Sequence, residues 1–250
     1  MLSRKWLASY NMNYIEILDW DSGFFGYKVA RARTGLSTAD IPLLLQELDT
    51  AKVKLAYYFS DDQIIFPDNN SFEVKLVDKK LTYLKQVQSF ETCEFISTYH
   101  SEDIPEELLN LSLESGHCSR FNKDENIGKQ KFEALYSTWI TAAVARQIAD
   151  EVLVYSKDGS IQGFITIGQK NGRADIGLIA VGQAYRGKGI GKALMHAAEA
   201  YCFPRLSQIQ VVTQGVNTAA RALYERGGYT IESEIFTYHI WNKSILDIKQ

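Results

Sequence analysis

The second half of the chain alternates between short apolar runs and helical patterns. Strands are predicted from the apolar runs at 151–155, 161–167, 173–181, 208–213 and 229–241. Glycine-containing turns separate the first three runs, which predicts consecutive antiparallel strands. Residues 190–203 have helical spacing that ends near Pro204, and Asn217 is a good N-cap for a helix over 218–226 that Gly227 closes. A sheet with helices packed on it follows from this alternation.

The first part of the chain predicts fewer elements. Residues 38–51 are predicted to form a helix with Ile41, Leu44, Leu45 and Leu48 on one face, 54–59 a strand, and 72–85 either one long strand or two. Further helices are predicted at 108–117 and at 130–150, the second with an apolar stripe typical of core packing, formed by Phe132, Leu135, Tyr136, Trp139 and Ile140.

Two domains are expected, with residues 88–107 as the linker: a smaller α/β domain over 1–100, and a second domain over 101–250. The order of helix, strand, polar stretch and strand in residues 38–85 is similar to the order at the end of the chain. We therefore expect the first domain to be a degenerate half-repeat of the second.

Composition bounds the class of protein. The 250 residues are 46% hydrophobic and 23% charged, as in soluble globular proteins, and the net charge of −3 argues against a nucleic-acid partner. No apolar run approaches the roughly 18 residues of a membrane span, and residues 1–10 make a poor secretory signal. Three cysteines without a CxxC pair favour neither a disulfide frame nor a metal site. We expect a cytoplasmic protein, and the sequence leaves monomer and homodimer open.

The most informative segment is the glycine-rich loop after the strand that ends at Val181. Residues 186–192 read Arg-Gly-Lys-Gly-Ile-Gly-Lys and lead directly into a helical pattern. A strand that leads into a glycine-rich helix N-terminus forms an anion site, because unpaired N–H groups and the helix dipole both favour negative charge. The dinucleotide fingerprint needs a glycine where Lys192 stands, and the nucleoside-triphosphate loop needs one where Arg186 stands. Both are therefore excluded.

The remaining pattern, Arg-x-x-Gly-x-Gly after a strand, together with residues 217–229 (NTAARALYERGGY), resembles the GNAT superfamily of acetyl-CoA-dependent N-acyltransferases. The resemblance implies an α+β fold, with a mixed, mostly antiparallel central sheet flanked by helices. It also implies acetyl-CoA as the acyl donor, without a metal. The residues expected to bind acetyl-CoA are Ile179, Ala180, Val181, Arg186, Gly187, Lys188, Gly189, Ile190, Gly191, Lys192 and Asn217.

The resemblance also implies catalytic roles. An N–H group near Val181 is expected to polarise the thioester carbonyl, and Tyr224 is expected to give a proton to the departing thiolate. Asn217 and Tyr224 are seven residues apart, which places them on one helix face. A phenol with an ordinary pKa near 10 keeps its proton at neutral pH. The general base stays open among His117, Glu114, Asp124 and Asp175, and an amine of moderate pKa needs none.

A weaker resemblance, which extends over nearly the whole chain, narrows the class of acceptor substrate. The segments 20–26 and 119–124, with Tyr136 and Trp139, are similar to those of bacterial N-acetyltransferases that act on nucleotide-linked amino sugars, such as dTDP-fucosamine, a dTDP-linked 4-amino-4,6-dideoxyhexose. That resemblance places the acceptor near Ser119, Arg120, Phe121 and Asp124, with Arg120 able to meet a diphosphate. The alternatives are a GNAT enzyme acting on a protein N-terminus, a polyamine or an aminoglycoside, and a non-catalytic module that binds acetyl-CoA.

Overall fold

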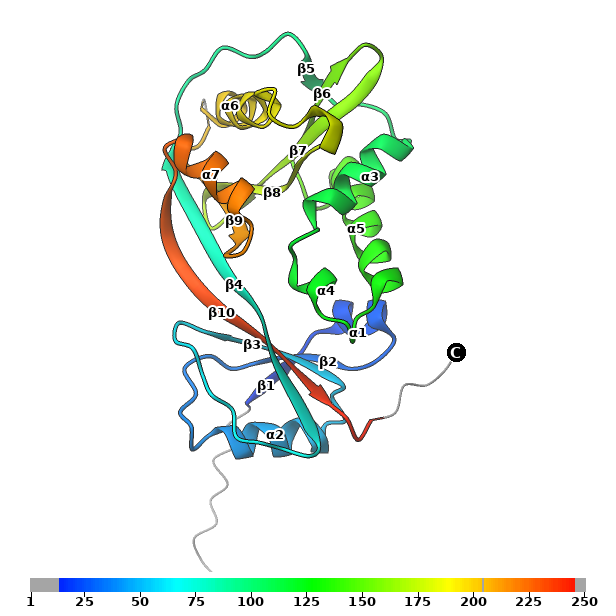
Figure 1. Cartoon of the computed structure of the whole chain (residues 1–250), viewed down its shortest axis with the longest axis vertical. Coiled ribbons are helices and arrows are strands. Elements are labelled where there is room, and N and C mark those ends of the chain that lie inside the picture. Colours follow the sequence, from blue (N-terminus) through cyan, green and yellow to red (C-terminus); the bar gives the residue numbers. More distant parts are fainter. Residues whose placement is uncertain (1–13, 204, 246–250) are drawn as a thin grey trace, which may run out of the picture. The chain divides into compact units, whose positions relative to one another are not determined.

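The computed structural model describes residues 14–203 and 205–245, and its chain divides into two compact units (Figure 1). One unit contains the residues up to Leu76 and those from Phe236 onward, and the other contains Val77–Ile235. These divisions fall inside two long strands, β4 and β10, whereas the sequence predicted one boundary near residue 100. Residues 1–10, predicted to be a poor secretory signal, and Pro204, the predicted helix stop, lie outside the described residues.

The described residues of the first unit form a small sheet and two helices. Its strands lie in the order β1-β2-β3-β10, where β2 and β3 are parallel and the other pairs antiparallel. The elements are β1 (Ile15–Ile17), α1 (Asp19–Phe25), β2 (Val29–Ala32), α2 (Ile41–Thr50), β3 (Leu55–Ser60) and the second half of β10 (Thr230–Asn242). The predicted apolar face of α2 is buried, and the half-repeat stays a prediction.

The second unit contains a larger sheet in the order β4-β9-β8-β7-β6-β5, in which β8 and β9 are parallel and the other pairs antiparallel. Its elements are β4 (Phe72–Gln86), β5 (Ile96–Thr98), α3 (Glu106–Ser115), α4 (Arg120–Lys123), α5 (Lys129–Val144), β6 (Glu151–Lys157), β7 (Ser160–Lys170), β8 (Arg173–Val181), α6 (Ile190–Cys202), β9 (Gln208–Gln214) and α7 (Thr218–Arg226). The predicted α+β class with a mixed, mostly antiparallel sheet is confirmed.

Helices cover both faces of this larger sheet, because side chains on a strand alternate between its two faces. On one face, Leu194 of α6 and Tyr224 of α7 join a core cluster with Ile165 of β7. On the other face, α3 and α5 pack against Phe164 and Ala180. The middle of β7 is therefore buried on both sides, and β8 lies between the two sets of helices (Figure 1).

Several short or interrupted elements differ from the sequence prediction. Helix α5 ends at Val144 rather than at residue 150, because Arg146 adopts a left-handed conformation (φ 59°) that stops the helix. The predicted linker contains β5, and residues 118–124, for which the sequence predicted no helix or strand, contain α4. Elements of three or four residues are too short to show periodicity in a sequence. In the part of the chain that the structure describes, no helix is long and apolar enough to cross a membrane.

Candidate active site

Strands β8 and β9 are paired over a short distance only. Their parallel register runs from Ala174 opposite Ile209 to Ile176 opposite Val211, and β8 then continues to Val181. The register between β7 and β8 shifts at the same level, so β8 contains an irregularity next to Ile176. A bulge bends the strand that carries it. The carboxyl ends of β8 and β9 are therefore separated, and each lines the same cavity.

One hydrogen bond stabilises this bulge. The N–H of Leu178 donates to the hydroxyl of Thr166 at 2.8 Å, so a side chain of β7 replaces the carbonyl that a regular ladder would supply. Gly177 lies opposite, where a Cβ atom would come within 3.0 Å of the Thr166 hydroxyl oxygen. A larger residue at position 177 would therefore crowd the Thr166 hydroxyl that accepts from Leu178.

The polar groups of β8 alternate between β7 and the open side. The N–H groups of Leu178 and Gly182 both donate toward β7, to the Thr166 hydroxyl and to the Gln162 carbonyl. Because N–H directions alternate along a strand, the N–H groups of Ile179 and Val181 point away from β7, into the space where β9 has separated. Ala180 directs its own polar groups toward β7. The chain thus offers two main-chain donors to the cavity.

The loop after β8 ends in exposed N–H groups. Gly187 and Gly189 have φ angles of 76° and 83°, which a residue with a side chain rarely adopts. The N–H of Ala193 makes the first hydrogen bond of α6, to the carbonyl of Gly189 at 3.0 Å. The N–H groups before it therefore have no acceptor within the helix, and they lie at its positive end. This geometry is that of an anion site.

Arg186 is engaged with protein groups in this structure. Its Nε donates to the carbonyl oxygen of Val181 at 3.1 Å, and its Nη2 forms an ion pair with the carboxylate of Glu114 on α3. The ammonium of Lys188 lies 5.2 Å from the centre of the Tyr185 ring. Arg186 and Lys188, two cationic residues of the predicted acetyl-CoA site, thus both have partners within the protein.

A cavity of about 1610 Å³ connects these features. Pockets for drug-sized ligands commonly measure about 300–1,000 Å³, so this one has room for a long donor and an acceptor together. Its wall contains every predicted acetyl-CoA contact except Lys188, and it also contains Tyr224. The lining members of the predicted set are Ile179, Ala180, Val181, Arg186, Gly187, Gly189, Ile190, Gly191, Lys192, Asn217 and Tyr224.

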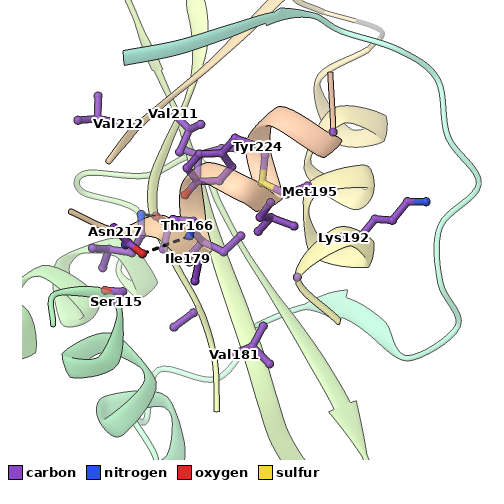
Figure 2. A pocket seen from close by; sticks show the side chains of 18 of the residues that line it. Ser115, Thr166, Ile179, Val181, Lys192, Met195, Val211, Val212, Asn217 and Tyr224 are labelled. Carbon is purple, nitrogen blue, oxygen red and sulfur yellow. Dashed lines mark hydrogen bonds between the residues drawn. The ribbon is translucent and has the colours of Figure 1, made fainter. Parts of the chain in front are cut away.

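Tyr224 lies on α7 with 2% of its surface exposed. Its ring packs against those of Tyr83 and Tyr229, with centroids 5.6 and 6.2 Å away. In Figure 2 its hydroxyl is directed toward the region of Thr166 and Ile179. Among the described residues no hydrogen-bond partner of this hydroxyl occurs. Burial raises the pKa of Tyr224 above its usual value, so the phenol keeps its proton at neutral pH.

Asn217 caps the helix that carries Tyr224. Its side-chain oxygen accepts a hydrogen bond from the N–H of Ala220 at 3.1 Å, as the N-cap prediction requires (Figure 2). The cap fixes the first turn of α7 at the end of the parted strand β9. The role of Asn217 in binding acetyl-CoA stays a prediction.

The base candidates divide into two groups. Glu114, His117 and Asp175 line the cavity, whereas Asp124 does not. The Asp175 carboxylate accepts a hydrogen bond of 2.6 Å from the Gln210 amide, and the Glu114 carboxylate is paired with Arg186. Asp124 is 2% exposed and accepts a hydrogen bond from the N–H of Asn126.

The four predicted acceptor residues lie around α4 and are not among those that line this cavity. Ser119 caps α4 and is hydrogen-bonded to Tyr136. Phe121 is buried against Trp139, with the ring centroids 5.7 Å apart, and the Arg120 guanidinium lies 4.3 Å from the Phe121 ring centre. Their contact with an acceptor, like that of Asp124, stays a prediction.

Other lining residues were not singled out as site residues from the sequence. Tyr136 and Trp139 belong to the stripe that was interpreted as core, and both reach the cavity. Lys85 and Glu199 form a buried ion pair at 2.9 Å with 9% and 1% of their side chains exposed. The bulge in β8 has one indication in the sequence, which is the glycine at position 177 inside a predicted strand. The described residues contain no cluster of metal-ligating side chains.

The parted strands, the glycine-rich loop and the buried tyrosine lie within one continuous segment of the chain. Residues 113–229 match the family described as "Acetyltransferase (GNAT) family". This part of the chain is a GNAT acetyltransferase domain, as its motifs predicted.

Individual relatives are distant. The chain is 26% identical over 139 residues to the spore coat polysaccharide biosynthesis protein SpsD of Bacillus subtilis, and the match spans 54% of this chain but only 47% of that protein. A conserved protein of unknown function from Staphylococcus epidermidis superimposes with a TM-score of 0.56 at 12% identity, over 87% of this chain and 86% of its own. A GCN5-related N-acetyltransferase from Sphaerobacter thermophilus gives 0.52 at 14% identity, over 90% and 75%. These two structures establish a shared fold.

Proposed function

We propose that the protein is an acetyl-CoA-dependent N-acetyltransferase that transfers the acetyl group directly from the thioester to an amine. The observation that carries this proposal is the separation of β8 from β9. It exposes the N–H groups of Ile179 and Val181 beside an anion-binding loop, in one cavity. A thioester donor needs both parts, because its diphosphate must be held while its carbonyl is polarised.

The loop and the strand bind different parts of the donor. The N–H groups from Gly187 to Lys192 hold the diphosphate, and the parted strand holds the pantetheine arm. The N–H of Val181 or of Ile179 donates to the thioester oxygen as the amine attacks and the oxygen gains charge. Fixed main-chain donors at such a position cost no reorganisation during the reaction.

Tyr224 acts on the leaving group. When the tetrahedral intermediate collapses, the carbon–sulfur bond breaks and the electron pair stays on sulfur. The neutral phenol of Tyr224 transfers its proton to that thiolate, the nitrogen of the attacking amine loses a proton to solvent, and solvent reprotonates the tyrosinate. A hydroxyl without a protein partner is free to make this transfer.

We propose a nucleotide-linked amino sugar as the acceptor. One support is the name of the Bacillus subtilis relative, a spore coat polysaccharide biosynthesis protein. The other is the lining of the cavity, which includes the aromatic side chains of Tyr136 and Trp139, able to contact a ring-shaped substrate, and the charged side chain of Lys170, able to meet an anionic group.

The test is release of coenzyme A thiol with acetyl-CoA and a panel of acceptors: nucleotide-linked amino sugars, peptides with free N-termini, polyamines and aminoglycosides. The proposal expects turnover with an amino sugar nucleotide, and mass spectrometry should show one added acetyl group. Turnover with peptides or polyamines alone would contradict the proposed amino-sugar acceptor but would still support the acetyltransferase activity. Acetyl-CoA binding without turnover on a complete panel would favour the non-catalytic module.

A further inference from the structure

Arg186 connects three parts of the site through one side chain. It belongs to the anion loop, its Nε holds the carbonyl of Val181 at 3.1 Å, and its Nη2 holds Glu114 on α3. The pair joins residues 72 positions apart in the sequence. The guanidinium therefore lies between the place for the diphosphate and the cavity wall formed by α3.

Glu114 is an unusual residue at its position. It lies in the last turn of α3, where the negative end of the helix dipole disfavours a carboxylate. It also lines the cavity, next to Ser115 and close to His117. Arg186 provides the compensating charge, and both side chains are accessible to solvent, with 55% of Arg186 and 41% of Glu114 exposed.

Two anions thus compete for one guanidinium once a diphosphate enters the loop. A guanidinium binds phosphate oxygens with two parallel hydrogen bonds, and the loop amides would hold the diphosphate beside it. An exposed ion pair is weak, because water competes for both partners. The pair between Arg186 and Glu114 is therefore one that a diphosphate can displace.

We propose that Arg186 moves from Glu114 to the diphosphate of acetyl-CoA when the donor binds, and that this exchange releases the Glu114 carboxylate to receive the cationic amine of the acceptor. The inference rests on the proposed function and deepens it. While Arg186 is paired with the Glu114 carboxylate, it neutralises that charge and leaves little attraction for an ammonium group. The exchange makes the attraction for the amine depend on the bound donor.

The test uses coenzyme A, which carries the diphosphate without the acetyl group, in calorimetric titrations of four proteins. These are the wild type, Glu114→Gln, Arg186→Gln and the double variant. Glu107→Gln, an exposed position in the first turn of the same helix, controls for loss of a charge on α3. Thermal melting checks that all five proteins fold.

Glu114→Gln is expected to tighten coenzyme A binding by about 1.4- to 5-fold, because an exposed ion pair worth about 0.2–1 kcal/mol no longer has to be broken. Arg186→Gln is expected to weaken binding, and Glu114→Gln should then have no further effect. Glu107→Gln should match the wild type. The crystal structure of the coenzyme A complex should place Arg186 on the diphosphate and beyond ion-pair distance from Glu114.

Several results would overturn the exchange. Unchanged or weaker binding by Glu114→Gln contradicts it, and equal tightening in the presence and absence of Arg186 indicates plain charge repulsion instead. A complex in which Arg186 still contacts Glu114 also refutes it. If the wild type binds coenzyme A and one of these results appears, only the exchange fails. If the wild type does not bind coenzyme A, the proposed function fails with it.

Discussion

Replacing Tyr224 by Phe separates chemistry from stability at the candidate site. The ring is retained, so the packing of Tyr224 against Tyr83 and Tyr229 persists. The lost hydroxyl has no hydrogen-bond partner among the residues described, so its removal leaves no buried donor or acceptor unpaired. The free energy of unfolding is therefore expected to change by less than about 1 kcal/mol.

The effect on turnover should be large. A positioned acid typically accelerates a reaction by about 10²- to 10⁴-fold, which corresponds to about 2.7–5.4 kcal/mol at 1.36 kcal/mol per decade. We expect Tyr224→Phe to lower kcat by such a factor. Coenzyme A affinity should stay within about twofold, because the diphosphate site lies on the loop rather than on α7.

The assay combines thiol release, calorimetric titration of coenzyme A and urea unfolding. Tyr229→Phe is the matched control, because the Tyr229 hydroxyl donates to Glu199 at 3.2 Å. It should lose stability and keep its turnover. Full turnover by Tyr224→Phe would remove Tyr224 from the mechanism, and a fall in turnover that merely follows loss of folded protein would refute the separation argued here.

Three further changes test other parts of the unit. Thr166→Val removes the acceptor of the Leu178 N–H and should cost about 1–3 kcal/mol of unfolding free energy in urea titrations, while a cost near zero would mean that the bulge is stabilised otherwise. Asn217→Ala should lower the free energy of unfolding by about 1 kcal/mol, and Asn217→Ser, which keeps a capping oxygen, should not; weaker coenzyme A binding by the serine variant would assign the amide to the donor. Burial raises the pKa of Asp78 from 3.8 to about 7, against the opposing charge of Arg120. A raised carboxyl pKa contributes stability that is lost as pH rises from about 4 to about 7, so Asp78→Asn should have a higher urea midpoint than the wild type at pH 8 but not at pH 4; equal midpoints at pH 8 would contradict this.

The elements that the sequence predicts well are those long enough to show a period. Helix α2 buries the expected leucines, and α7 begins at the expected cap. The glycine-rich loop could be recognised from the sequence, because its glycine spacing alone distinguishes it from two other phosphate loops. The sequence therefore predicts the fold class correctly, and the residues that it assigns to the donor, except Lys188, line one cavity.

The residues of the proposed acceptor site could not be predicted from the sequence in the same way. Glu114 and Arg186 meet although 72 residues separate them, and no local pattern announces such a pair. Tyr136 and Trp139 share a stripe that predicts core, yet both reach the cavity, since an aromatic ring at its edge fits either environment. Ser119 caps α4 and Phe121 packs against Trp139, while their contact with an acceptor stays a prediction.

The opening between β8 and β9 depends on how a bent strand keeps its backbone groups paired. A strand that leaves its neighbour exposes N–H groups on that side, and a bulge leaves another one unpaired on the other side. Thr166 supplies the missing acceptor on the β7 side, and Gly177 lets its hydroxyl approach. The groups left without partners are then those of Ile179 and Val181, on the side where a pantetheine arm and a thioester can satisfy them. The strand thus keeps its donors free only where the proposed substrate lies.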